Sequence, residues 1–252
     1  MPGVSGPERD SLPQLLVQLA GSPDDASDVD ACLRLIARRV ADTVKGVDYA
    51  SVTSSRAGKP TTVAMSSNVA LEVDSSQYEG GGPCVEALEG QPIAVPDVAA
   101  DMQWPDFRRT AMGLGLHMSL SIPMVTASGE TTNVLNLYSH EAGALVPLAT
   151  EVIALFHPEA ERPRTRNWEE LLDEGGRLLV IGMQRALAVS DSIQAALGVL
   201  MAAEQVDAQQ AYLSLRMQAA STGEAIPLVA ERILASASRG PETGPDQQAR
   251  QG

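Results

Sequence analysis

The spacing of apolar residues changes once along this chain, and that change limits the folds it can adopt. Between residues 29 and 157, helix-like spacing of three and four alternates with strand-like spacing of two. Beyond residue 168 the spacing is helical throughout. The two regions meet at residues 157–168, HPEAERPRTRNW, where two prolines and a run of charges interrupt both patterns. A chain of 252 residues is long enough for two cores, so we predict a mixed domain followed by a helical one.

The mixed region begins with an amphipathic helix and continues as paired strands. Strand–turn–strand patterns occupy residues 47–67 and 117–139, each with a glycine in its turn. A helix is predicted to begin at Pro105, because the fixed φ of proline suits a first turn, and another to cover residues 147–156. This order predicts an α+β domain, an antiparallel sheet flanked by helices. The buried face of the first helix is predicted to consist of Val29, Cys32, Leu33, Ile36, Val40 and Val44.

The region beyond residue 168 predicts an all-α bundle of three helices. Asp207 is suited to cap the second of them, and Gly223 follows its last residues. Short connections require the three helices to bury their apolar stripes on each other or on a partner chain. The predicted segments are an N-terminal tail and short helix at 1–27, the α+β domain at 28–157, a linker at 158–168, the helical domain at 169–238 and a tail at 239–252.

Charge and composition exclude several classes of protein. The net charge is −14 and the sequence pI is about 4.6, so the chain as a whole repels phosphate and anionic membrane surfaces. Two cysteines cannot form a disulfide framework. The first ten residues do not have the pattern of a signal peptide, and no uninterrupted apolar run approaches the ~18 residues of a membrane span. We expect a cytoplasmic protein without a membrane partner.

No arrangement of residues in the sequence predicts catalysis. His117, His140 and His157 lie in three separate elements without the spacing of metal ligands. No serine–histidine–aspartate, cysteine–histidine or paired-glutamate pattern emerges. We therefore predict a protein that is not an enzyme and uses no metal and no cofactor.

Several motifs resemble those of a known family. Residues 80–107, GGGPCVEALEGQPIAVPDVAADMQWPDF, together with SIPM and NVLNLYS, resemble the GAF sensor domain of bacterial GAF–ANTAR regulators. Residues 178–235, with RALAVSDSIQAALGVLM, AYLSLR and PLVAERIL, resemble the ANTAR domain, an RNA-binding antitermination module. The resemblance implies a signal-sensing transcription regulator, in which a GAF domain that binds a small ligand or a protein controls dimerisation and the binding of an RNA hairpin. The expected assembly is a homodimer.

The helical region departs from that family in its charge. The resemblance implies an arginine where Ser190 stands, a lysine where Leu197 stands and a base near Ala225 or Pro227. Glu169–Arg239 contains five arginines and nine acidic residues, a net charge of −4, and arginine and lysine supply most non-specific affinity for nucleic acids. An alternative therefore stays open: a divergent ANTAR protein that has lost RNA binding and acts through protein or small-ligand contacts.

The candidate ligand-pocket residues are Cys84, Asp97, Trp104, Phe107 and Tyr138. The glycine run before Cys84 fits a structural turn better than a phosphate cradle, because it lacks the lysine of a P-loop. Cys84 itself is either a redox-sensing thiol or a small buried hydrophobe. Trp104 and Phe107 either line a pocket or pin their loop to the sheet, and Tyr138 either faces a pocket or is half-buried at the surface.

The candidate RNA-binding residues are Arg177, Arg185 and Arg216, which are basic positions on the predicted helices. The candidate dimer seam is Ile193, Leu197 and Leu200. A heptad spacing of leucines at 171–179 also hints at a helical seam, which the glycines at 175, 176 and 182 interrupt. Pro158 and Pro163 are expected to break any continuous helix that joins the two domains.

Overall fold

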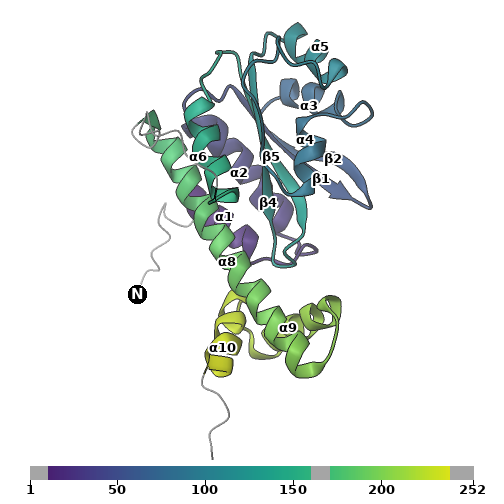
Figure 1. The fold of residues 1–252 in the computed structure, drawn as a ribbon, viewed down its shortest axis with the longest axis vertical. Coiled ribbons are helices and arrows are strands. Elements are labelled where there is room, and N and C mark those ends of the chain that lie inside the picture. The colour runs from purple at the N-terminus through teal and green to yellow at the C-terminus, as the bar shows by residue number, and fades with distance from the viewer. Residues whose placement is uncertain (1–10, 160–170, 239–252) are drawn as a thin grey trace, which may run out of the picture. The chain divides into compact units, whose positions relative to one another are not determined.

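The computed structural model describes residues 11–159 and 171–238, and every structural statement below refers to them (Figure 1). The chain forms two compact units, Met1–Ser190 and Asp191–Gly252. The predicted tails and most of the predicted linker, including Pro163, lie outside the described residues. The domain boundaries inferred from the sequence therefore stay predictions.

A five-stranded antiparallel sheet forms the centre of the first unit. Its strand order is β2-β1-β5-β4-β3, as expected for two hairpins joined by longer connections. Across the three central strands Ser51, Asn136 and Ser121 lie in one row of the register. The sheet confirms the predicted α+β class. The strands are β1 Tyr49–Arg56, β2 Lys59–Met65, β3 Ile93–Val95, β4 Met118–Val125 and β5 Thr131–Ser139.

One face of the sheet is apolar and packs against helices. Alternate strand residues such as Val52, Leu120 and Leu135 point to this face, because successive side chains of a strand point to opposite sides. They share one hydrophobic core with the helices on this side of the sheet (Figure 1). Those helices are α1 Leu12–Ala20, α2 Val29–Thr43, α6 Val146–Phe156 and the first half of α8 Glu174–Glu204. Each apolar residue predicted for the face of α2 is buried.

The other face of the sheet is covered by short helices and turns. A second, smaller core contains Val73, Val95, Phe107 and Leu116. Pro105 begins α5, as predicted, and Gly113 ends it. The sheet is therefore buried on both faces. The covering elements are α3 Asn68–Ser75, α4 Pro83–Glu86, the 3-10 turn η1 Ala87–Glu89 and α5 Pro105–Gly113.

Helix α8 approaches α1 and α2 at two glycines. A Cβ atom on Gly175 would lie 2.0 Å from the carbonyl oxygen of Thr43, at the end of α2. A Cβ atom on Gly182 would lie 2.7 Å from Leu16 Cδ1 and 2.8 Å from Pro13 Cα in α1. The sequence reading treats these glycines as interruptions of a helical seam. These two glycines also allow α8 to approach α1 and α2 closely, so they have a packing role that the sequence does not predict.

Within residues 191–238, the described part of the second unit, the secondary structure is helical. This part contains the end of α8, helix α9 (Ala208–Thr222) and helix α10 (Ile226–Ser238). As predicted, the Asp207 side chain caps α9 by accepting a hydrogen bond of 2.8 Å from Gln210 N, and Gly223 ends it with φ of +70°. Its buried apolar residues are Ile193, Ala196, Leu197, Leu200, Ala211, Leu215, Ala219, Ile226, Val229 and Ala230.

Helix α8 is long and apolar enough to cross a bilayer by length and composition alone, with a mean hydropathy of 1.6 in its most apolar window. The sequence did not predict this helix as a candidate membrane span, because polar residues interrupt its apolar run. Leu179, Met183 and Ala186 belong to the core of the first unit. A helix that supplies core residues to its own chain passes the same test, so α8 is a weak indication of a membrane span.

Candidate functional site

The second face of the sheet is lined by polar side chains that are fully buried. We call this set the polar face. Each of the three central strands β1, β5 and β4 supplies two members, because the apolar residues between them point to the opposite side. Buried polar groups are costly unless they form hydrogen bonds, so such a face indicates a specific arrangement. Its members are Ser51 and Thr53 of β1, Ser119 and Ser121 of β4, and Asn136 and Tyr138 of β5.

Asp74 of α3 lies over the centre of the polar face and is completely buried. Its Oδ1 atom accepts hydrogen bonds from the hydroxyls of Tyr138 at 2.6 Å and Ser51 at 2.9 Å, and from Asn136 Nδ2 at 3.4 Å. Its Oδ2 atom accepts one from the Thr62 hydroxyl at 2.9 Å. Burial raises the pKa of Asp74 from 3.8 to about 6, and the hydrogen bonds from hydroxyl groups oppose that rise.

A chain of hydroxyl groups leads away from Asp74. The Thr62 hydroxyl is hydrogen-bonded to Tyr78, and the Tyr78 hydroxyl lies 3.3 Å from Thr53 Oγ1. Asn136 Nδ2 donates to Thr53 Oγ1 at 3.0 Å. Burial and the nearby carboxylate of Asp74 raise the pKa of Tyr78 well above its ordinary value. Tyr78 therefore stays neutral, with its hydroxyl free to donate in either direction along the chain.

Gln77 fastens the glycine-rich turn to the polar face. Its Oε1 atom accepts a hydrogen bond of 2.9 Å from the backbone N–H of Cys84, and its Nε2 atom donates to the Tyr138 hydroxyl at 3.2 Å. A Cβ atom at Gly82 would lie 2.4 Å from Gln77 Oε1. A side chain at that position would thus displace Gln77. The turn has a structural role here, as the absence of a P-loop lysine predicts.

Trp104 and Phe107 pin their loop in the same region. The indole Nε1–H of Trp104 donates to Glu86 Oε1 at 2.8 Å, and Gln103 Nε2 donates to the same oxygen at 3.1 Å. The two aromatic rings are 6.5 Å apart in an edge-to-face arrangement at 86°. Both side chains belong to the smaller core with Tyr138.

The structure brings together four of the five predicted pocket residues: Cys84, Trp104, Phe107 and Tyr138. Asp97 is not among them, because it is exposed and its carboxylate accepts a hydrogen bond of 3.0 Å from Ala99 N in a local turn. The alternative of a half-buried surface Tyr138 is wrong, since its side chain is 1% exposed. Cys84 is buried and desolvation raises the pKa of its thiol well above the ordinary value, which opposes a redox role.

Sequence reasoning missed Asp74, Gln77, Tyr78 and Asn136. Two signals were available. Small polar residues alternate with apolar ones in β1 and β4, and Asp74 follows the buried residues Ala70 and Val73 at helical spacing. Alternation by itself indicates that the polar side faces solvent, so the meaning of these residues depends on the helices that cover them.

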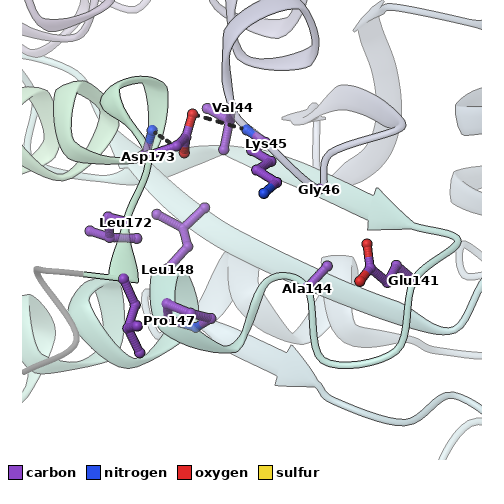
Figure 2. A pocket seen from close by; sticks show the side chains of 11 residues that line it. Val44, Lys45, Gly46, Glu141, Ala144, Pro147, Leu148, Leu172 and Asp173 are labelled. Carbon is purple, nitrogen blue, oxygen red and sulfur yellow. Dashed lines mark hydrogen bonds between the residues drawn. The ribbon is translucent and has the colours of Figure 1, made fainter. Parts of the chain in front are cut away.

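A separate cavity of about 220 Å³ lies at the start of α8 (Figure 2). The Asp173 carboxylate there accepts hydrogen bonds from the backbone N–H groups of Lys45, Gly175 and Gly176 at 3.1–3.2 Å. This carboxylate satisfies the N-terminal N–H groups of the helix. The described residues that line the cavity are Val44, Lys45, Gly46, Glu141, Ala144, Pro147, Leu148, Leu171, Leu172, Asp173 and Gly176.

The three candidate RNA-binding arginines do not form one cluster within a single unit. Arg177 and Arg185 lie in the first unit on α8, and Arg216 lies in the second unit on α9. Arg177 and Arg185 are both exposed, and Arg177 Nη1 donates to the carbonyl oxygen of Leu172 at 2.5 Å. The Arg216 guanidinium lies 5.8 Å from the centre of the Tyr212 ring. Their contact with RNA stays a prediction.

The candidate dimer residues Ile193, Leu197 and Leu200 are at most 7% exposed in the single chain. Contacts within the chain are enough to bury them, so their burial does not require a second subunit. Leu197 also stands where the resemblance implies a lysine. A lysine at this buried position would have to leave the packing to reach phosphate.

Comparison with known proteins identifies both regions. Residues 26–156 match the family model of the GAF domain, and residues 182–234 match that of the ANTAR domain. The GAF and ANTAR domains are regulatory rather than catalytic domains, and they define a class of sensory and regulatory proteins. Since the GAF match alone spans more than half of the chain, the protein belongs to the GAF family, and it carries the two domains in the order of GAF–ANTAR regulators, as the motifs predict.

Two solved structures show a distant likeness to this chain, and no curated protein matches the sequence. A domain of a putative two-component sensor histidine kinase from Sinorhizobium meliloti 1021 is 16% identical, with a TM-score of 0.36 over 67% of this chain and 93% of its own. A type II free methionine-R-sulfoxide reductase from Thermoplasma acidophilum is 12% identical, with a TM-score of 0.34 over 65% and 94%. Neither likeness supports an argument about function.

Proposed function

We propose that this protein is a transcription regulator of the antiterminator type, in which the GAF domain senses a signal and the ANTAR domain contacts an RNA hairpin. The order of the two matched domains carries the proposal. The protein acts by binding and not as an enzyme, in the cytoplasm and without a membrane. The signal of the GAF domain would act at the polar face, where the buried hydroxyl of Ser119 has no hydrogen-bond partner among the described residues.

The helical region offers few basic side chains for contact with RNA phosphates. Arg185 and Arg216 lie inside the ANTAR match, and Arg177 precedes it. If all three contacted phosphates, the logarithm of the affinity would fall with the logarithm of the salt concentration with a slope of about −2 to −3. This shallow slope is a quantitative signature of the proposal.

A gel-shift titration of the full chain with an RNA that contains two hairpins tests the RNA contact. The double variant Arg185→Gln, Arg216→Gln should bind less tightly and show a shallower salt slope. The double variant Arg34→Gln, Arg38→Gln is the matched control, because both are exposed arginines on α2 and the same two charges are lost. Absence of binding at low salt, with the folded wild-type protein, would remove the proposal.

A specific observation favours the alternative, in which the helical unit binds a protein. The described part of the second unit contains two arginines and five carboxylates, and Arg232 is paired with Glu224 at 2.9 Å. It also exposes Leu213, Met217 and Leu228, at 50%, 72% and 54%. Large exposed apolar side chains are a feature of protein-binding surfaces.

The two functions give different results when α9 is changed. Leu213→Ser with Met217→Ser should abolish capture of a protein partner by the alternative function and leave RNA affinity unchanged. If wild type captures RNA and no protein, the alternative is excluded.

We place the contact surface of the expected homodimer on α8, at residues other than the candidates predicted from sequence. Leu178 and Ile181 are three residues apart on α8 and are 37% and 39% exposed. Residues at this spacing lie on the same side of a helix. Sedimentation of Leu178→Lys should show monomers if this seam holds the dimer. Leu213→Lys, which adds the same charge on α9, should leave the dimer intact.

A further inference from the structure

We infer that the signal read by the polar face is the proton itself: protonation of Asp74 reverses the chain of hydroxyl hydrogen bonds that connects α3 to the glycine-rich turn. This inference rests on the proposed sensory function of the GAF domain and specifies its ligand. A proton needs no cavity, which suits a site that side chains already fill.

Asp74 has no countercharge among the described residues. The hydrogen-bond donors to Asp74 described in the structure are Tyr138, Ser51, Thr62 and Asn136, all of them neutral. The other titratable groups that face it are Tyr78 and Cys84, from the segment after α3 and from α4, and both are held neutral by burial. Among the described contacts no lysine, arginine or histidine fixes the charge of the carboxylate.

With Asp74 ionised, the Thr62 hydroxyl donates to Oδ2, so Thr62 must accept from Tyr78, and Tyr78 in turn accepts from Thr53. A single hydroxyl proton per residue leaves one consistent arrangement, in which every proton points toward the carboxylate. The hydroxyl groups of Ser51 and Tyr138 also donate their hydrogen bonds to Asp74.

A proton taken from solvent onto Oδ2 makes this oxygen the donor to Thr62. Thr62 then donates to Tyr78, and Tyr78 donates to Thr53. Thr53 is thereby released to donate to the sulfur of Cys84, the thiol whose pKa the Thr53 hydroxyl lowers. The net change is one proton gained and one negative charge lost. The reversed chain ends at Cys84, whose backbone N–H is held by Gln77.

Thr62, on the edge strand β2, and Tyr78 are both partly exposed, so the chain of hydroxyls connects buried Asp74 to solvent. Because burial raises the pKa of Asp74 to about 6, the carboxyl changes charge between about pH 5 and pH 7. A carboxyl in an ordinary exposed position titrates well below this interval.

Infrared difference spectra of the full chain between about pH 5 and pH 7 test the protonation directly. The band of a protonated buried carboxyl should appear at the acid end in wild type, and also in the control Asp97→Asn, which removes an exposed carboxylate of the same domain. It should be absent in Asp74→Asn, whose Nδ2 atom imitates the protonated Oδ2 as a donor to Thr62.

Amide hydrogen exchange of residues 68–86, corrected for the intrinsic effect of pH, tests the coupling. Its protection should change with the same midpoint in wild type, and should be independent of pH in Asp74→Asn. Thr62→Val keeps the carboxyl but removes the first hydroxyl of the chain, so this variant should keep the infrared band and lose the change in exchange. It also replaces Asp74→Asn as the test if that variant does not fold.

An Asp74 that stays ionised throughout, or one that titrates without any change in exchange at residues 68–86, would overturn the inference. Gel shifts at both ends of the pH range separate it from the proposed function. If RNA never binds and the infrared and exchange changes are present, the RNA proposal fails and the proton switch stands.

Discussion

Gly175→Ala, which adds one methyl group, should push the start of α8 away from the end of α2 and destabilise the first unit. The new Cβ would lie 2.0 Å from the carbonyl oxygen of Thr43, where ordinary van der Waals contact requires at least 3.4 Å. The atom in the way belongs to the backbone, so no rotamer change can relieve the overlap, and α8 must retreat by more than 1 Å. Such a shift weakens contacts of the buried neighbours Leu172 and Leu179.

The magnitude follows from two opposing effects. Overpacking of a core contact costs about 1–3 kcal/mol, and the backbone overlap places Gly175→Ala at the upper end. Replacing glycine by alanine within a helix contributes about 1 kcal/mol in the stabilising direction. The expected net loss is about 2 kcal/mol, equivalent to a fall in Tm of about 4–8 °C for a unit of this size. Gly182→Ala should lose less, because its backbone overlap, 2.8 Å from Pro13 Cα, is milder than the 2.0 Å at Gly175, and the Leu16 side chain can move.

Gly198→Ala is the matched control, since it is the same substitution on the same helix. A Cβ atom at Gly198 meets no atom within 4 Å, so only the gain in helix propensity, about 1 kcal/mol, applies. Calorimetry with far-UV circular dichroism should therefore report opposite signs for Gly175→Ala and Gly198→Ala. If both raised Tm, the close packing of α8 on α2 would be refuted.

Three further predictions concern buried groups. Leu197→Lys places a charge at a position that is 4% exposed. The free energy of unfolding should fall by several kcal/mol, and the second unit should lose helical circular dichroism. A melting curve identical to that of wild type would contradict the packing. For Asp74, the folded protein holds a proton that the unfolded chain has already lost between pH 3.8 and about 6. The free energy of unfolding should thus fall by about 3 kcal/mol as pH rises through that window and stay level above it; denaturant titrations at several pH values should show this slope in wild type and not in Asp74→Asn. Glu86→Gln replaces the charged acceptor of the Trp104 indole N–H and should weaken that hydrogen bond by about 1 kcal/mol. Hydrogen exchange in residues 99–104 should therefore increase. Glu89→Gln, a control in the next turn, should leave this exchange unchanged.

The sequence predicts those parts of the fold that local physics decides. The burial of Ile36 and Val40 follows from helical spacing, and the start of α5 follows from the fixed φ of Pro105. The Asp207 cap likewise requires only the side-chain oxygen and the N–H three residues on. The family resemblance, carried by several motifs, extended these local predictions to the order of the two domains.

The candidate site could be predicted only in part, because its meaning depends on long-range packing. Trp104 and Tyr138 were identified as residues, but their partners Glu86 and Asp74 are 18 and 64 residues away in the sequence. Ser119 alternates with apolar neighbours as a solvent-facing residue would. Only the cover of α3 and α5 makes that side of the sheet an interior surface.

The burial of both native thiols has a practical consequence for measuring this protein in solution. Cys32 and Cys84 are 5% and 0% exposed, and burial raises the pKa of each thiol above its ordinary value. Maleimide and nitroxide reagents attack exposed thiolates, so a single cysteine introduced on the surface can be labelled without first removing the natural ones. Fluorescence or spin-label rulers can therefore be placed on an otherwise unaltered chain.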